Sequence, residues 1–115
     1  MKKIWVYDPH SGGSKLSSQH QEEICKQVTT FAKKRLWYPK VQLKVRFKNQ
    51  FCYVYTIESG DDRELPLCRL RHFQTDWSMA LFTYSNDTYQ PCAFPDGKQT
   101  GTLVAALELC EEFIV

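Results

Sequence analysis

The strongest constraint on the fold is a period-two pattern that runs from residue 41 to residue 48. Every second residue is apolar, and each residue between them is polar or charged, which is typical of a β-strand with one buried face. Residues 51–57 follow a short turn and are rich in aromatic and β-branched side chains. They predict a second strand, antiparallel to the first. The apolar positions of the first strand are Val41, Leu43, Val45 and Phe47.

Two further strands are predicted downstream of this hairpin. Residues 65–72 and 76–84 have the composition of strands, and they form a second hairpin across residues 73–75. A polar loop separates the two hairpins. Residues 85–101 contain turn residues throughout, and only residues 89–94 within them have extended character. We therefore expect four strands in the sheet.

A helix is predicted before these strands, over residues 16–37. Its apolar side chains recur at helical spacing on one face. Ser18 and Gln21 fit a capping box at its start. Glu22 and Glu23 are placed in the first turn, where the helix dipole favours negative charge.

A second helix is predicted over residues 103–115, with Thr102 as its N-cap. Strands bracketed by helices indicate an α+β domain in two layers. We expect a four-stranded antiparallel sheet with two helices packed on one face, in a single domain over residues 1–115. The other face of the sheet is then exposed to water or to a partner.

Composition excludes several classes of protein. Charged residues make up 24% and hydrophobic residues 43% of the 115, which is typical of a globular domain rather than of a disordered chain. A net charge of +2 is lower than that of a dedicated nucleic-acid binder. No apolar run approaches the ~18 residues of a membrane span, and no signal peptide is recognised. The five cysteines are an odd number without a C-x-x-C pair, which favours reduced thiols and a cytoplasmic location.

The segment Asp8–Lys15 is a glycine-containing loop that follows a short apolar run, predicted as a strand, at residues 4–7. Phosphate-binding loops occur between a strand and a helix, but the spacing of a P-loop is not met here. A weak anion site near the helix N-terminus is the alternative to a flexible tether. We expect residues 1–17 to form a partly flexible N-terminal strand and loop. The candidate anion-binding residues are Gly12, Gly13, Ser14 and Lys15.

Residues with catalytic or metal-binding chemistry are scattered along the chain. Cys68 and His72 have the C-x-x-x-H spacing of a zinc half-site, but on a strand this spacing separates them by roughly 13 Å. Nothing in the pattern places Cys92 beside a base. No catalytic residue, metal ligand or cofactor is therefore predicted. The alternative is a metal-dependent hydrolase or nuclease centred on the acidic residues Glu58, Asp61, Asp62 and Glu64.

The surface best suited to binding is one face of the first hairpin. If the turn has two or four residues, the cations of the first strand share a face with the aromatic rings of the second, whereas a three-residue turn reverses the partners. Such a face suits a non-catalytic binding module for a protein partner or for self-association as a homodimer, and alternatively for single-stranded nucleic acid. The simplest alternative is that rings and aliphatic stems only cover one another. The candidate binding residues are Lys44, Arg46, Tyr53, Tyr55, Arg69 and Arg71.

Two stretches also carry a family resemblance. They are DPHSGGSK at residues 8–15 and TYSNDTYQPCAFPDGKQTGT at residues 83–102. With LCRLRHF at residues 67–73, they are similar to a family of short uncharacterised bacterial proteins that begin around a PHSGG segment. The resemblance implies a bacterial, cytosolic, single-domain protein. That family has no assigned activity or ligand, so no functional residue is carried over from it.

Overall fold

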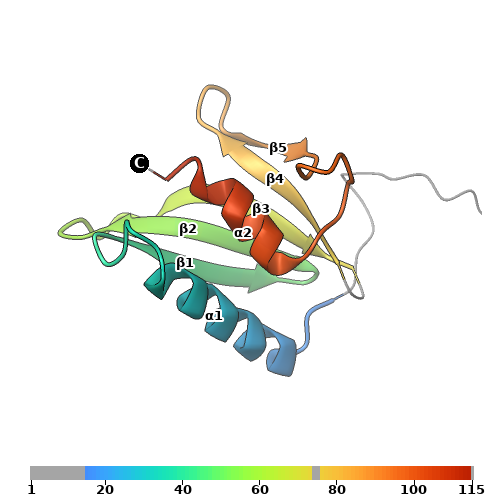
Figure 1. Cartoon of the computed structure of the whole chain (residues 1–115), viewed down its shortest axis with the longest axis horizontal. Helices are drawn as coiled ribbons and strands as arrows, with labels where there is room; N and C mark the ends of the chain where they lie inside the picture. The colour runs from blue at the N-terminus through green and yellow to red at the C-terminus, as the bar shows by residue number, and fades with distance from the viewer. Residues whose placement is uncertain (1–14, 74–75, 115) are drawn as a thin grey trace, which may run out of the picture.

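The structure, a computed structural model, describes residues 15–73 and 76–114. Within these residues the chain forms two helices and five strands (Figure 1). In chain order the elements are α1 (Ser18–Lys33), β1 (Val41–Lys48), β2 (Phe51–Glu58), β3 (Leu65–His72), β4 (Trp77–Thr83), β5 (Thr88–Cys92) and α2 (Leu103–Glu111).

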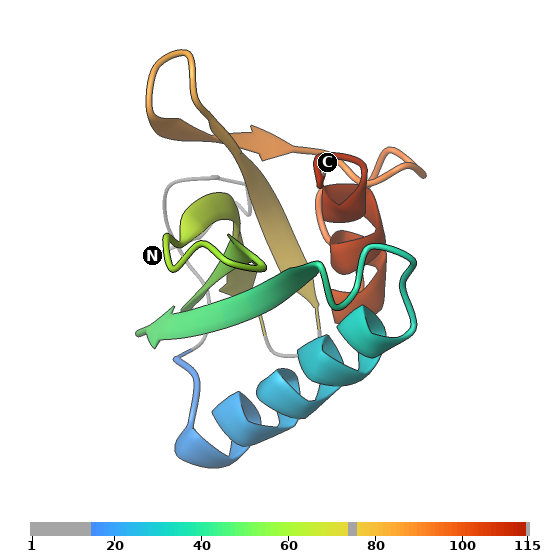
Figure 2. The same ribbon diagram turned by 90° about the vertical axis from the view of Figure 1, so that its left-hand side faces the viewer.

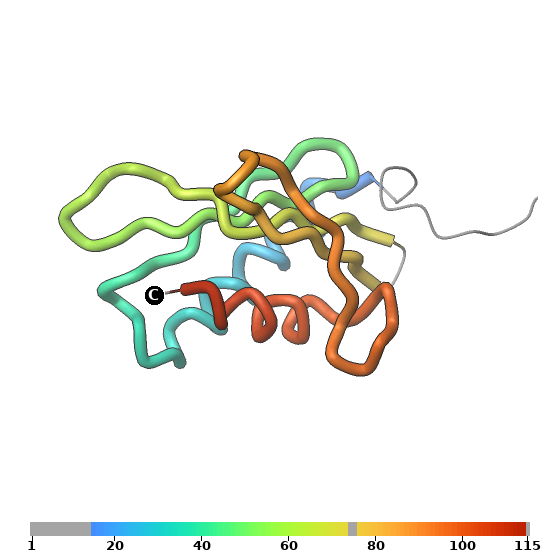
Figure 3. Tube along the Cα trace, turned by 90° about the horizontal axis from the view of Figure 1, so that it is seen from above, coloured from blue at the N-terminus to red at the C-terminus, as the bar shows by residue number. Residues whose placement is uncertain are grey.

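The five strands form one antiparallel sheet in the order β1-β2-β3-β4-β5, so each strand pairs with the next one along the chain. Both helices cover the same face of this sheet, as Figure 1 and Figure 3 show from two directions. Figure 2 shows how strongly the sheet is twisted. We call the face under the helices the inner face and the opposite one the outer face. The predicted α+β class is confirmed.

The predicted number of strands is wrong, because residues Thr88–Cys92 form a fifth strand. β5 pairs with β4 from Thr83 opposite Thr88 to Met79 opposite Cys92. The segment contains Pro91, which has no N–H to donate and is tolerated only at an edge such as this one. Its composition alone therefore did not identify it as a strand of the sheet.

The register of the first hairpin is the one predicted for a two-residue turn. Lys48 pairs with Phe51, and the turn residue Asn49 has a positive φ of 54°, a conformation that asparagine adopts more readily than most residues. The inner-face pairs include Val45 opposite Val54. Cations and rings therefore share the outer face.

The start of α1 differs from the prediction. Ser17, rather than Ser18, is the N-cap, and its side chain accepts a hydrogen bond from the backbone N–H of His20. Glu22 and Glu23 lie beyond the first turn, which contains no acidic residue. The N-cap thus satisfies an N–H that the helix itself leaves without a partner.

The ends of the two helices are tied together. α2 begins after Thr102, the predicted N-cap, whose side chain accepts a hydrogen bond from the N–H of Ala105. α2 ends at Glu111, whose carboxylate accepts hydrogen bonds from the Arg35 guanidinium and from the Trp37 indole N–H at 2.9 Å. These contacts fix the segment after α1 against the end of α2.

The hydrophobic core lies between the inner face and the two helices. Among its members, Leu70, Met79 and Leu107 are each 0–2% exposed. Val28 and Phe31 contribute from α1. None of the helices in the described part of the chain is long and apolar enough to cross a membrane.

Several predictions fall outside the described residues. They are the strand at residues 4–7, the loop from Asp8 up to residue 14, and the turn residues Gln74 and Thr75 of the second hairpin. The partly flexible N-terminal segment predicted over residues 1–17 is described only from Lys15 onward.

Candidate binding face

Cations of β1 lie directly opposite aromatic rings of β2 on the outer face. Arg46 pairs with Tyr53, and Lys44 pairs with Tyr55. The side chains of Lys44 and Arg46 are 47% and 55% exposed, whereas both tyrosines are half-buried. The cations thus stand at the solvent-accessible margin of a ring-lined surface.

Glu64 holds two of these cations. Its carboxylate lies 2.8 Å from Lys44 Nζ, and Arg46 Nη2 donates to both of its oxygens, at 2.8 and 2.9 Å. The hydrogen bond from Lys44, followed by that from Arg46, lowers the pKa of Glu64. Because Glu64 precedes β3, the contact reaches across β2 and joins the loop before β3 to the cations of β1, with the Arg46 guanidinium near the ring of Tyr55.

Arg69 is half-buried between aromatic rings. Its guanidinium carbon lies 4.9 Å from the ring centre of Phe51 and 5.2 Å from that of Tyr89, distances typical of cation–π contact. Arg71 lies on the same side of β3, 5.2 Å from the Phe51 ring centre, and is only 3% exposed. Both arginines therefore contribute to packing on the outer face.

The fifth strand supplies an aromatic residue that the sequence did not single out. Tyr89 of β5 contacts the ring of Tyr53 at 5.8 Å between centroids, although β3 and β4 separate the two strands. Phe82 lies 5.1 Å from Tyr89. Burial raises the pKa of Tyr89 to about 12. Ala80 of β4 lies directly opposite Arg69 and is only 5% exposed, so part of the outer face is a small second core.

The acidic loop does not assemble into a metal site. Asp61 accepts hydrogen bonds from the Arg63 side chain, the nearest at 3.0 Å, and this bonding lowers the pKa of Asp61. Glu64 is engaged by Lys44 and Arg46. Among the described residues, no group of three or more His, Cys, Asp or Glu side chains could hold a metal ion.

The cysteines are free thiols, and three of the five are buried. Burial raises the pKa of Cys52 to about 12 and also raises that of Cys92. A thiol whose pKa is raised carries little of the reactive thiolate at neutral pH. The buried thiols therefore have a packing role. Cys110 is an example, since its Sγ lies 3.3 Å from the sulfur of Met79 in the core.

The candidate anion site is described only at its last residue. Lys15 is exposed and lies two residues before the N-cap of α1. Gly12, Gly13 and Ser14 lie outside the described residues. The proposed anion site therefore stays a prediction.

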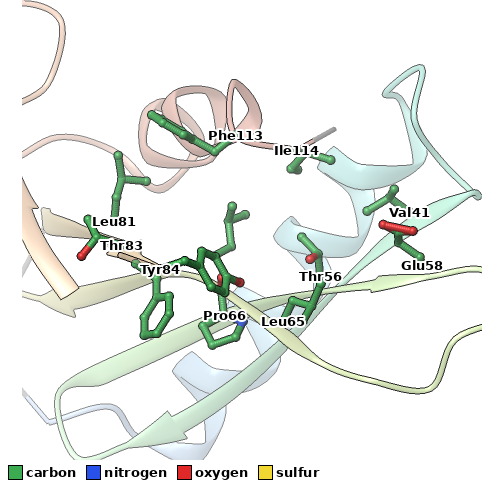
Figure 4. A pocket seen from close by; sticks show the side chains of 12 residues that line it. Val41, Thr56, Glu58, Leu65, Pro66, Leu81, Thr83, Tyr84, Phe113 and Ile114 are labelled. Atoms are coloured by element: carbon green, nitrogen blue, oxygen red, sulfur yellow. The ribbon is translucent and has the colours of Figure 1, made fainter. Parts of the chain in front are cut away.

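A separate pocket of about 340 Å³ opens on the inner face beyond the end of α2. Figure 4 shows Phe113 and Ile114 on one side of it and Glu58 at the far end. Leu65, Tyr84 and Phe113, three of the exposed large hydrophobic residues, all line it. Among the described residues of its wall there is one carboxylate and no lysine or arginine. The lining therefore suits a neutral apolar group better than an anion.

Comparison of the chain with protein-family models, with curated proteins and with solved structures found no match. The arrangement of side chains on the outer face is therefore the basis on which function is inferred.

Proposed function

We propose that this protein is a small, non-catalytic binding module that holds an acidic protein partner on its outer face. The observation that carries the proposal is the row of exposed cations on β1, Lys44, Arg46 and Lys48, placed opposite the rings of β2. Among the described residues, one carboxylate, Glu64, pairs with this row. The row therefore keeps positive charge that a partner's carboxylates can neutralise.

The packing of the rings favours a protein over single-stranded nucleic acid. Binding of bases requires open ring faces on which they stack. The Phe51 ring is approached by Arg69 and Arg71, and the Tyr89 ring by Arg69. Tyr53 meets Tyr89 edge-on. Rings that already have such partners offer little stacking surface. At a protein interface, tyrosine also acts through its ring edge and hydroxyl, and arginine through its N–H groups.

A homodimer through the same face is a weaker candidate. Two copies meeting face to face would bring two rows of cations together, and like charges at an interface are unfavourable. The proposal therefore commits to a different, acidic protein.

A cytoplasmic location belongs to the proposal too, because the five free cysteines suit a reducing compartment.

The test measures binding of two fluorescent probes by anisotropy. The probes are a synthetic peptide in which glutamate and valine alternate, and an oligothymidylate of the same net charge. We expect the peptide to bind to the natural chain. The double variant Lys44→Gln with Arg46→Gln should lower the affinity for the peptide by about tenfold or more. The matched control removes two exposed cations elsewhere, Lys33→Gln with Lys98→Gln, and should change the affinity by less than about twofold.

Three results would contradict the proposal. Equal losses in the two double variants would mean that only net charge matters. Tighter binding of the oligothymidylate, lost in the Lys44 and Arg46 variant, would favour nucleic acid. A fall in melting temperature in the Lys44 and Arg46 variant that accounts for its lost binding would assign these side chains a structural role.

A further inference from the structure

β1 is an edge strand of the sheet, because the strand order begins with it. Figure 1 shows β1 as the last strand on this side of the sheet, with α1 lying below it in the view. Among the described residues, no strand pairs with this edge. An unpaired edge carries backbone N–H and C=O groups that can template another strand.

The register determines which backbone groups face outward. In a two-residue hairpin the closing pair, here Lys48 and Phe51, exchanges both hydrogen bonds, and bonded pairs then alternate along the strands. The N–H and C=O of Leu43, Val45 and Phe47 consequently point away from β2. In the described part of the chain, none of these six groups has a backbone partner, whereas the N–H of Val41 donates to Trp37 O at 2.8 Å.

A groove lies beside this edge on the inner face. It measures about 560 Å³, and Phe47 of β1 forms one wall. Cys25, Glu22 and Lys26 of α1 form much of the other wall. A strand added to β1 would alternate its side chains between the two faces. An inner side chain beside Phe47 would enter this groove, and the outer side chains would lie beside Lys44, Arg46 and Lys48.

The charges identify the kind of strand that fits. Cross-strand neighbours of opposite charge are favourable, and like charges directly opposite are unfavourable. On the outer face the added strand therefore carries carboxylates. On the inner face apolar side chains suit the half-buried Leu43, Val45 and Phe47. The opposite edge, β5, has five residues and contains Pro91, which makes it a poorer template.

We propose that an extended segment of a protein partner, with alternating acidic and apolar residues, adds to β1 as a sixth strand. This inference rests on the proposed function and specifies how the partner enters. A second copy of β1 does not fit, because antiparallel pairing about Val45 would place Lys44 opposite Arg46 of the other copy. Strand addition of this kind draws affinity from main-chain hydrogen bonds and specificity from alternate side chains.

The first test is amide hydrogen exchange of the full chain, with and without the glutamate–valine peptide. Addition of the strand should slow exchange at Leu43, Val45 and Phe47 by about tenfold or more at saturating peptide. The N–H groups of Lys44 and Arg46 already bond to β2 and should change little. Bound peptide without slower exchange at the three edge positions would overturn the inference while leaving the proposed function intact.

The second test removes one edge donor. Val45→Pro deletes an N–H that points away from β2, and an edge strand tolerates this loss. The substitution should lower the affinity for the peptide by about tenfold. Val45→Ala is the control, because it shortens the same side chain but keeps the N–H, and should cost less than about threefold. Exchange at β2 amides verifies that Val45→Pro keeps the hairpin.

The two proposals fail in different ways. If Val45→Pro binds the peptide normally and the Lys44 and Arg46 variant does not, the partner lies flat on the outer face and strand addition is wrong. If neither variant changes binding, the proposed function is wrong. Edge amides that are already protected before peptide is added, or a dimer in solution that loses this protection on dilution, would mean that another occupant fills the edge and would overturn the inference.

Discussion

Arg46 and Glu64 form a two-pronged ion pair across β2, in which Arg46 Nη2 lies 2.8 Å from one carboxylate oxygen and 2.9 Å from the other. The guanidinium carbon also lies 6.0 Å from the centre of the Tyr55 ring. Glu64 thereby occupies the position that a partner's carboxylate would take. The outer face carries its own acidic substitute, which an incoming acidic chain has to displace or share.

Replacement of Glu64 should therefore strengthen binding of an acidic chain. Glu64→Gln keeps the size of the side chain and removes the charge that competes for Lys44 and Arg46. We expect the affinity for the glutamate–valine peptide to rise by about two- to fivefold, with a steeper salt dependence. The measurement is a peptide titration at two salt concentrations. Weaker binding would show instead that Glu64 orients the cations for the partner.

Stability should fall in acid because of Glu111. The Arg35 hydrogen bond is the main cause that lowers the pKa of Glu111 in the folded protein, and the unfolded chain has the ordinary value of about 4.3. The stabilisation is complete above that value and is lost as the pH falls through the lowered folded pKa. Thermal melts from neutral pH downward should stay level to about pH 5 and then decline.

The matching variant is Glu111→Gln. It keeps an acceptor for the Trp37 indole but removes the titrating group. Its melting temperature at neutral pH should be lower by a few degrees, and its decline in acid should be shallower than that of the natural chain. Parallel curves for the two proteins would assign the acid sensitivity to other carboxylates.

Tyr89 should titrate later than an ordinary tyrosine. Burial raises the pKa of Tyr89 to about 12 although the nearby Arg69 charge lowers it, whereas a free tyrosine ionises near pH ~10. Ultraviolet titration of tyrosinate should therefore show a late component that is missing from Tyr89→Phe. Stability should fall between the two pKa values, because the unfolded chain releases this proton first. Loss of an ordinary component near pH ~10 in Tyr89→Phe, with the late component retained, would place Tyr89 in solvent.

Gly101 should not accept a side chain. A Cβ atom at this position would lie 2.7 Å from two ring carbons of Phe94, which is closer than packed atoms approach. Gly101 also exchanges backbone hydrogen bonds with Trp77, at 2.8 and 2.9 Å, so the backbone cannot easily withdraw. Gly101→Ala should lower the free energy of unfolding by about 1–3 kcal/mol in urea melts.

The contact with Phe94 can be isolated by a double-mutant cycle. Phe94→Ala opens the space that the new Cβ would occupy, so Gly101→Ala should cost much less in that background. Additive losses in the two variants would locate the damage in the pairing with Trp77 instead.

Local patterns were sufficient for the two strands of the first hairpin and for the class of fold, but they left the length of the turn open. Alternation along β1 predicted which of its residues share a face, whereas the structure showed that the turn at Asn49 has two residues and so fixed the partners on β2. A strand's side chains alternate with a period of two, so one buried face determines the register once the turn length is known. The apolar faces of the two helices predicted where each helix lies along the sequence, although α1 is capped one residue earlier than its sequence indicates.

Long-range pairing decided what those patterns left open. β5 is too short and too poor in strand-forming residues to be recognised alone, and it becomes a strand because β4 supplies its hydrogen bonds. The ion pairs on the outer face also depend on long-range contacts. The sequence indicated only that Glu64 belongs to an acidic loop, whereas in the fold Glu64 reaches across β2 and pairs with Lys44 and Arg46. The chain alone thus determined which residues can share a face, since that depends on backbone geometry between neighbours. Only the tertiary structure determined which of them touch, because those contacts join strands that are distant along the chain.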